Sequence, residues 1–139
     1  MNEKRMEIAR RFAACPKWVW LRGMSVRSGD HPCERWLFDG EAWVSDEGDT
    51  YRLPDLCAPA SLIMAVANGP DLDDDLTRLG VLAVVRRAWG HLACVESPAV
   101  SGLLRLSTDP APWRVHFRGG IAVGDTEEDA LLSALKSAS

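Results

Sequence analysis

Two short segments place a histidine close to a cysteine, which is the most metal-like pattern in the sequence. They are His31-Pro32-Cys33 and His91-Leu92-Ala93-Cys94. Two such pairs supply the four nitrogen and sulfur ligands that a structural zinc ion takes. The spacings match no standard zinc motif, and residues three apart on a strand, such as His91 and Cys94, point to opposite faces. We therefore predict that the protein binds neither a metal nor a cofactor.

Groups that act as nucleophiles or bases are present, but none lies in a catalytic motif. The four cysteines and three histidines occur without a Gly-x-Ser-x-Gly elbow or the surroundings of a cysteine protease. No glycine-rich loop has the spacing of a phosphate-binding motif. Glu96 is the best candidate for a carboxylate with a raised pKa, yet we expect it to face outward from a strand. We predict no catalytic residue, and an enzyme of unrecognised type is kept as an alternative.

An acidic, tryptophan-rich stretch is the leading candidate for binding a partner. Residues 29–55 contain eight acidic and two basic side chains, and the chain of 139 residues has six tryptophans. Asp39-Gly40 is a two-residue turn signal, because both residue types tolerate the positive φ that such a turn needs. A hairpin closed there places Trp36 opposite Trp43.

The predicted binding face has this tryptophan pair at its centre and carboxylates around it. The candidate partner-binding residues are Trp36, Trp43, Glu41, Asp46, Glu47 and Asp49, with Glu34 beside them. An aromatic anchor with a polar rim is the usual energetic pattern of an interface. Carboxylates can also compete with nucleic acid for a basic groove. The alternative is that Trp36 and Trp43 pack under a helix of the same chain.

Basic side chains gather at the start of the chain and favour a different function. Residues 1–22 hold six of them, Lys4, Arg5, Arg10, Arg11, Lys17 and Arg22, against two acidic ones. A basic first helix would suit a small nucleic-acid-binding module, because phosphate neutralisation dominates such binding. The whole chain has a net charge of −4, however, which argues against this role.

Capping residues, prolines and glycines divide the chain into predicted elements. Helices are predicted over 3–14, 59–67, 74–89 and 126–136. Short strands are predicted within 24–53 and over 91–97, 103–107, 113–117 and 121–123. Turns rather than crossover helices join the strands, which favours an α+β fold: antiparallel meander sheets packed with about four helices, in a single domain over 1–139. On the 74–89 helix we expect Leu76 and Leu79 to face the core.

Two features bear on the cellular location. The sequence has no apolar stretch of about 18 residues, the length needed to span a bilayer. Its N-terminal residues are charged and lack the apolar centre of a signal peptide. We therefore expect a cytoplasmic protein that does not enter a membrane, with reduced cysteines.

Four segments carry a family resemblance. They are Trp18–Met24, Pro54–Leu56 with Pro59–Leu62, Val84–Gly90 and Gly124–Leu131. Together they resemble a group of small, functionally unassigned proteins encoded by tailed phages and prophages. The resemblance implies a phage accessory protein that acts inside a bacterial host cell, and it implies no catalytic residue.

These observations lead us to expect a non-enzymatic protein that binds another protein, from the host or from the phage. One concrete form is an inhibitor of a host defence nuclease complex, of the anti-CRISPR kind, that occupies the basic nucleic-acid-binding groove of its partner. Regulatory or virion-assembly partners would produce the same sequence features.

Overall fold

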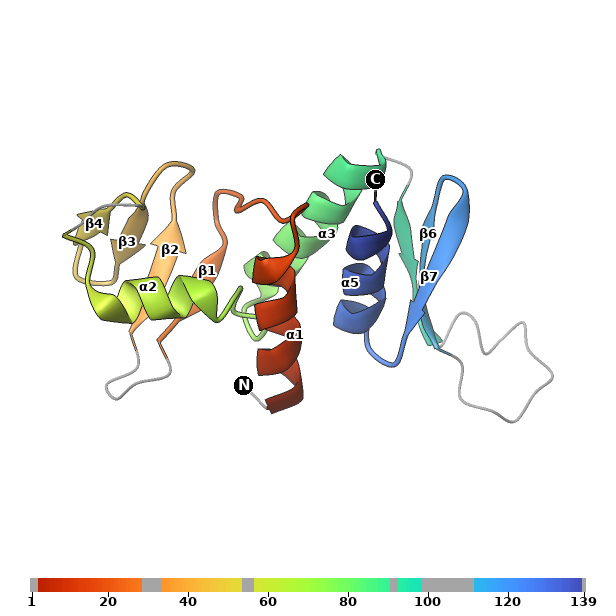
Figure 1. Ribbon diagram of the computed structural model, residues 1–139, viewed down its shortest axis with the longest axis horizontal. Coiled ribbons are helices and arrows are strands. Elements are labelled where there is room, and N and C mark those ends of the chain that lie inside the picture. The colour runs from red at the N-terminus through yellow and green to blue at the C-terminus, as the bar shows by residue number, and fades with distance from the viewer. Residues whose placement is uncertain (1–2, 29–33, 54–56, 91–92, 99–111, 139) are drawn as a thin grey trace. The chain divides into compact units, whose positions relative to one another are not determined.

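The computed structural model describes residues 3–28, 34–53, 57–90, 93–98 and 112–138 (Figure 1). Within these ranges the chain forms helices and two antiparallel sheets, so the α+β prediction is confirmed. It divides into two compact units, Met1–Gly80 (unit 1) and Val81–Ser139 (unit 2), which are treated separately below. The His31/Cys33 pair, His91 and the strand expected at 103–107 lie outside the described residues.

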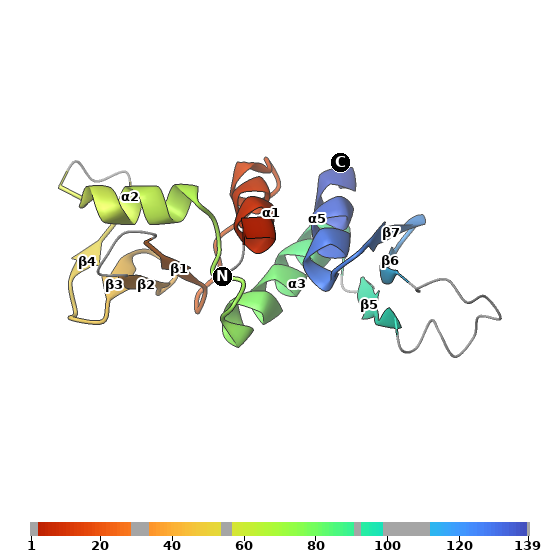
Figure 2. The ribbon, with the colours of Figure 1, turned by 90° about the horizontal axis from the view of Figure 1, so that it is seen from below.

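Unit 1 is a four-stranded antiparallel meander with helices around it. Its elements are α1 (Glu3–Ala14), β1 (Ser25–Arg27), β2 (Arg35–Phe38), β3 (Trp43–Ser45), β4 (Thr50–Tyr51), α2 (Ala60–Ala67) and the first part of α3 (Asp75–Trp89). The strands follow one another in the order β1-β2-β3-β4. Figure 2 shows α2 lying across one face of this sheet. The meander expected within 24–53 and the helices expected at 3–14 and 59–67 are thereby confirmed.

The β2–β3 hairpin has a different register from the one expected. Phe38 pairs with Trp43, and Trp36 pairs with Ser45, so the two tryptophans are not opposite each other. The cause is a four-residue loop in which Asp39 Oδ1 accepts hydrogen bonds from the backbone N–H of Glu41 (2.9 Å) and of Ala42 (2.7 Å). The register moves by two residues, and a two-residue shift preserves the faces of a strand. Trp36, Phe38 and Trp43 therefore still share one face.

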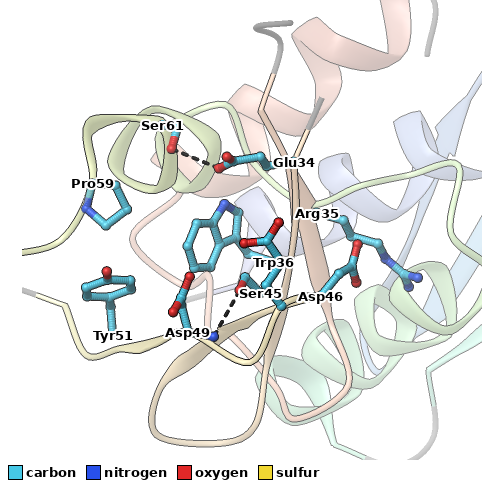
Figure 3. A pocket seen from close by; sticks show the side chains of 10 residues that line it. Glu34, Arg35, Trp36, Ser45, Asp46, Asp49, Tyr51, Pro59 and Ser61 are labelled. Atoms are coloured by element: carbon cyan, nitrogen blue, oxygen red, sulfur yellow. Dashed lines mark hydrogen bonds between the residues drawn. The ribbon is translucent and has the colours of Figure 1, made fainter. Parts of the chain in front are cut away.

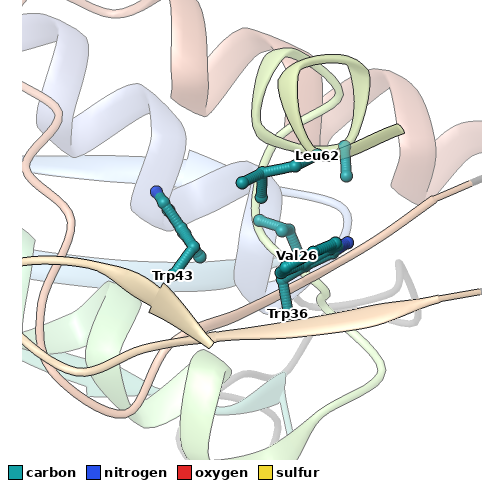
Figure 4. Close-up of a cluster of buried hydrophobic side chains, with 5 residues drawn as sticks. Val26, Trp36, Trp43 and Leu62 are labelled. Carbon is teal, nitrogen blue, oxygen red and sulfur yellow. The ribbon is translucent and has the colours of Figure 1, made fainter. Parts of the chain in front are cut away.

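That shared face is the core of unit 1. Val26, Trp36 and Trp43 pack from the sheet against Leu62 and Ala65 of α2 (Figure 4). Both tryptophans have an exposed fraction of 3%. This is the arrangement that the sequence left as the alternative, in which the pair packs under a helix. The aromatic anchor expected at the surface is therefore an internal element that holds α2 on the sheet.

A row of aromatic rings extends from this core. Phe12 contacts Trp18 at 5.3 Å between ring centroids, and Trp18 contacts Trp20 at 5.3 Å. Trp20 lies edge-on to Trp43 at 5.0 Å, and Trp43 in turn contacts Phe38 at 4.9 Å. Edge-to-face and tilted pairs at these separations are the favoured geometries of aromatic rings. The row links α1, the segment before β1, and the β2–β3 hairpin.

The start of α3 is joined to β1 by a buried hydrogen-bond network. Thr77 Oγ1 accepts from the backbone N–H of Ser25 at 2.9 Å and donates to Asp74 Oδ2 at 2.6 Å. Asp74 also caps the helix by accepting from the backbone N–H of Thr77. The buried stripe of α3 accordingly begins at Thr77. Leu76 and Leu79, which were expected to face inward, are each 65% exposed, so that prediction was wrong.

Unit 2 is a three-stranded antiparallel sheet covered on one face by a helix. Its elements are the rest of α3, β5 (Cys94–Glu96), β6 (Trp113–Phe117), β7 (Gly120–Gly124) and α5 (Glu127–Ser137). The order is β5-β6-β7, and α5 packs on β6 and β7. Thr126 caps α5, since its Oγ1 accepts from the backbone N–H of Asp129 at 3.2 Å. Trp89 stacks on Phe117 at 4.2 Å and donates to the Ala134 carbonyl.

Candidate binding pocket

A pocket with a volume of about 390 Å³ opens in unit 1 beside the core cluster (Figure 3). The residues that line it are Glu34, Arg35, Trp36, Ser45, Asp46, Glu47, Asp49, Tyr51, Pro59 and Ser61. They come from β2, the β3–β4 hairpin and the beginning of α2. The pocket therefore exists only because the meander and α2 pack together.

The walls of the pocket combine aromatic and polar groups. Tyr51 and Trp36 lie 5.9 Å apart between ring centroids, at an interplanar angle of 64°. Pro59 precedes α2 in an extended conformation, and the first turn of that helix brings Ser61 to the pocket. Ser61 Oγ donates to Glu34 Oε2 at 3.1 Å, which ties the helix to the residue before β2. These contacts hold one side of the pocket in place.

The rim consists of three exposed carboxylates on the tight β3–β4 turn. Asp46, Glu47 and Asp49 are all exposed. Ser45 fixes the turn, since its Oγ accepts from the backbone N–H of Asp49 at 3.0 Å. Gly48 adopts a φ of 92°, which a residue with a side chain rarely takes. The turn thus projects three closely spaced acidic side chains around the pocket.

Within the described ranges, none of these three rim carboxylates has a cationic partner in the chain. The ion pairs of unit 1 use other acidic residues, such as Asp74 with Arg35 and Glu41 with Arg52. Arg35 lines the pocket, but its Nη2 lies 3.3 Å from Asp74 Oδ1. The pocket therefore contains four carboxylates and the guanidinium of Arg35, whose Nη2 pairs with Asp74 and whose buried Nε has no hydrogen-bond partner among the described residues. Its electrostatic potential favours a cationic ligand.

Trp36 contributes a buried polar group. Its Nε1 is buried and has no hydrogen-bond partner among the residues that the structure describes. Figure 3 shows this nitrogen at the edge of the indole ring that faces Glu34 and Ser61. Buried donors normally find an acceptor, so this N–H can pair with an acceptor supplied by water or by a bound molecule.

The structure brings together only part of the predicted face. Asp46, Glu47, Asp49 and Trp36 all line the pocket. Trp43 lies within the core, and Glu41 lies in the β2–β3 loop, where Arg52 pairs with it at 2.8 Å.

Sequence reasoning missed five of the lining residues: Arg35, Ser45, Tyr51, Pro59 and Ser61. The nearness of Tyr51, the only tyrosine, to Asp49 was the one available signal for them.

Among the described residues of unit 2, Cys94 and His116 form no activated nucleophile. Cys94 pairs with His116 across β5 and β6, and His116 Nε2 lies 3.1 Å from Glu96 Oε2. Glu96 is therefore paired with His116, and its side chain is only partly exposed. Cys94 is exposed, and no hydrogen bond joins its sulfur to His116. No group of three or more His, Cys, Asp or Glu side chains within the described ranges could hold a metal ion.

The basic first helix is partly neutralised by acidic neighbours. Arg5 Nη1 lies 2.7 Å from Asp73 Oδ1, and Arg11 Nη2 lies 2.7 Å from Glu7 Oε1. Asp73 has a pKa below its ordinary value: burial opposes the ionised form, while the hydrogen bond and the positive charge of Arg5 favour it. These contacts reduce the positive charge that α1 can offer to phosphate groups, which weakens the nucleic-acid interpretation.

Comparison with known proteins adds no relative: no family model, no curated protein and no solved structure matches the chain. Among the helices of the described residues, none combines the length and the apolar character needed to cross a bilayer.

Proposed function

We propose that the protein is a non-enzymatic binding protein whose acidic pocket in unit 1 engages a basic surface of another protein. The observation that carries this proposal is the set of unpaired rim carboxylates, Asp46, Glu47 and Asp49. Exposed charges of one sign accelerate encounter with a partner of the opposite sign and disfavour partners of the same sign. A tight turn that presents three of them together is suited to that role.

The resemblance to proteins of tailed phages and prophages supports a specific setting for this binding. In that setting the protein acts inside a bacterial cell on a host or phage protein. An inhibitor of a host defence nuclease complex, of the anti-CRISPR kind, is the version that fits an acidic surface best. Such a complex binds nucleic acid through a basic groove, and carboxylates in that groove would compete with phosphates.

The test begins with capture of a partner by the tagged protein from a bacterial lysate, followed by association kinetics with the purified partner. The rim variant combines Asp46→Asn, Glu47→Gln and Asp49→Asn. A matched control combines Glu3→Gln, Glu41→Gln and Asp125→Asn, which removes the same charge from exposed positions outside the pocket. We expect the rim variant to associate about tenfold more slowly at low salt, and the control to differ little from the wild type.

The same association rates are then measured at increasing salt concentration. Screening shortens the range of exposed charges from about 30 Å at 0.01 M to about 10 Å at 0.1 M salt. The association rate of the wild type should therefore fall as salt is added, while that of the rim variant stays nearly constant. Equal slowing of the rim and control variants would show that only net charge matters and would reject the pocket as the binding face.

A further inference from the structure

The rim carboxylates and the indole of Trp36 each have a chemical need that a ligand can meet, and together they restrict what binds in the pocket. The exposed rim carboxylates form their strongest hydrogen bonds with donors that carry positive charge. The buried Nε1 of Trp36, a residue only 3% exposed, requires an acceptor. A bare cation would satisfy the first need alone, since it has no acceptor to offer. A ligand that meets both needs carries a cationic group and an acceptor oxygen in one molecule.

The cationic group that fits best is a guanidinium. Its planar fork of N–H groups bonds carboxylates in pairs, whereas an ammonium is a compact point charge. The pocket offers four carboxylates from two separate segments, Glu34 on one side and Asp46, Glu47 and Asp49 on the other. A group whose donors diverge in one plane can reach both sides, which a single ammonium centre does less well.

Tyr51 adds a second reason to favour arginine. Its ring forms part of the pocket wall and is partly exposed. Guanidinium groups stack on aromatic faces, where the electron-rich ring attracts the cation. Carboxylates beside an aromatic wall are thus complementary to the charge and to the flat shape of an arginine side chain.

The acceptor is available from the same residue. A peptide-linked arginine carries main-chain carbonyl oxygens a few bonds from its side chain. One of them can accept from Trp36 Nε1 and so satisfy the buried donor. A pocket of about 390 Å³ accommodates one side chain with its peptide units rather than a folded segment.

We infer that the pocket is a recognition site for a single arginine residue in an exposed peptide segment of a protein partner. The guanidinium lies among the rim carboxylates and against Tyr51, and a main-chain carbonyl accepts from Trp36 Nε1. This inference rests on the proposed function and deepens it, because it specifies which residue of the partner is bound.

The experiment uses the whole protein and four small probes. They are the N-acetyl N-methylamides of arginine, of citrulline and of lysine, together with N-butylguanidinium. Citrulline keeps the shape and the carbonyl groups of arginine but has no charge. N-butylguanidinium keeps the charge but has no carbonyl. Binding is followed by the ¹H–¹⁵N resonance of the Trp36 indole. The Trp18 indole, also buried and without a partner but outside the pocket, is the internal reference.

We expect the arginine probe to shift the Trp36 indole resonance in a saturable way while the Trp18 resonance stays in place. The lysine probe and N-butylguanidinium should each bind about threefold or more weakly, and citrulline about tenfold or more weakly, since each lacks one of the matched features. Asp49→Asn and Tyr51→Leu should weaken arginine binding by about threefold. Glu41→Gln, which removes the same charge outside the pocket, should not.

The inference is overturned if the arginine probe produces no saturable shift, if citrulline binds as well as arginine, or if Trp18 and Trp36 respond alike. Its failure is separable from that of the proposed function. Slower partner association in the rim variant without arginine binding would reject the arginine site alone. Arginine binding together with partner kinetics unaffected by the rim variant would reject the proposed function and leave the arginine site standing.

Discussion

Gly69 and Ala9 approach so closely that no side chain fits between them. A Cβ on Gly69 would lie 1.9 Å from the carbonyl oxygen of Ala9, and Gly69 also has a φ of 92°. Gly69→Ala should therefore destabilise the protein by about 3 kcal/mol, through overpacking added to backbone strain. Gly48→Ala is the matched control, because Gly48 has the same φ with nothing within 4 Å. It should cost only about 1 kcal/mol. Urea unfolding measures both, and equal losses would contradict the close approach.

Trp43 is a core residue of unit 1, with contacts to Trp20 and Phe38. Trp43→Ala should lower the free energy of unfolding by about 3–5 kcal/mol, because it removes a large buried side chain and leaves a cavity. Leu37→Ala is the control, since Leu37 lies on the neighbouring strand with 42% of its surface exposed. That change should cost less than about 1 kcal/mol. A loss of stability for Trp43→Ala as small as that for Leu37→Ala would contradict the placement of Trp43 in the core.

Thr77 joins α3 to β1 through its hydroxyl group. Thr77→Val keeps the shape of the side chain but leaves the buried backbone N–H of Ser25 without its acceptor. The expected loss is about 1–3 kcal/mol of stability. Thr50→Val makes the same chemical change at an exposed position, where it should be nearly neutral. The free energies of unfolding of the two variants are compared by thermal or urea unfolding. Equal losses for Thr77→Val and Thr50→Val would show that the network does not stabilise the protein.

Asp39 makes the stability of the β2–β3 hairpin depend on pH. Hydrogen bonds from the backbone N–H of Ala42 and of Glu41 lower the pKa of its carboxyl group below the ordinary value of 3.8. A lowered pKa stabilises the fold above the unfolded-state value, and this contribution is lost as the pH falls through the folded-state value.

Asp39→Ala should therefore reduce the urea midpoint near neutral pH, and the gap from the wild type should narrow below about pH 4. Asp46→Ala serves as the control, because Asp46 is an exposed turn residue whose side chain accepts no backbone hydrogen bond from the described residues. It should show no comparable gap. A difference between wild type and Asp39→Ala that is constant across pH would show that the ionised carboxylate is not what holds the loop.

The helices could be predicted from the sequence because their signals are local. Pro59 and Thr126 precede α2 and α5, and Asn68-Gly69 ends α2, as expected from their backbone preferences. The buried face of α3 was harder to predict. The hydroxyl of Thr77 is buried because Ser25 supplies a donor from a distant strand, and no helical periodicity contains that information.

The hairpin register and the pocket could also be predicted only in part from the sequence. Asp39-Gly40 correctly marked a turn, but the side chain of Asp39 widens it to four residues and moves the register. The high density of acidic residues in this turn is a feature of the sequence itself, so Asp46, Glu47 and Asp49 could be predicted as binding residues. Tyr51 and Ser61 could not, because they meet only after β4 and α2 have packed around Trp36.

The aromatic row of unit 1 gives this part of the chain its own optical signature. Trp18 and Trp20 are nearly perpendicular at 89°, and Trp20 and Trp43 at 81°, with centroids about 5 Å apart. Electronic transitions of indoles held in such fixed, chiral contact couple and produce circular dichroism in the near ultraviolet. Excitation also passes readily between rings at this separation, so emission reports on the whole row rather than on single tryptophans. Unfolding of unit 1 can therefore be followed by a signal that arises from its own rings.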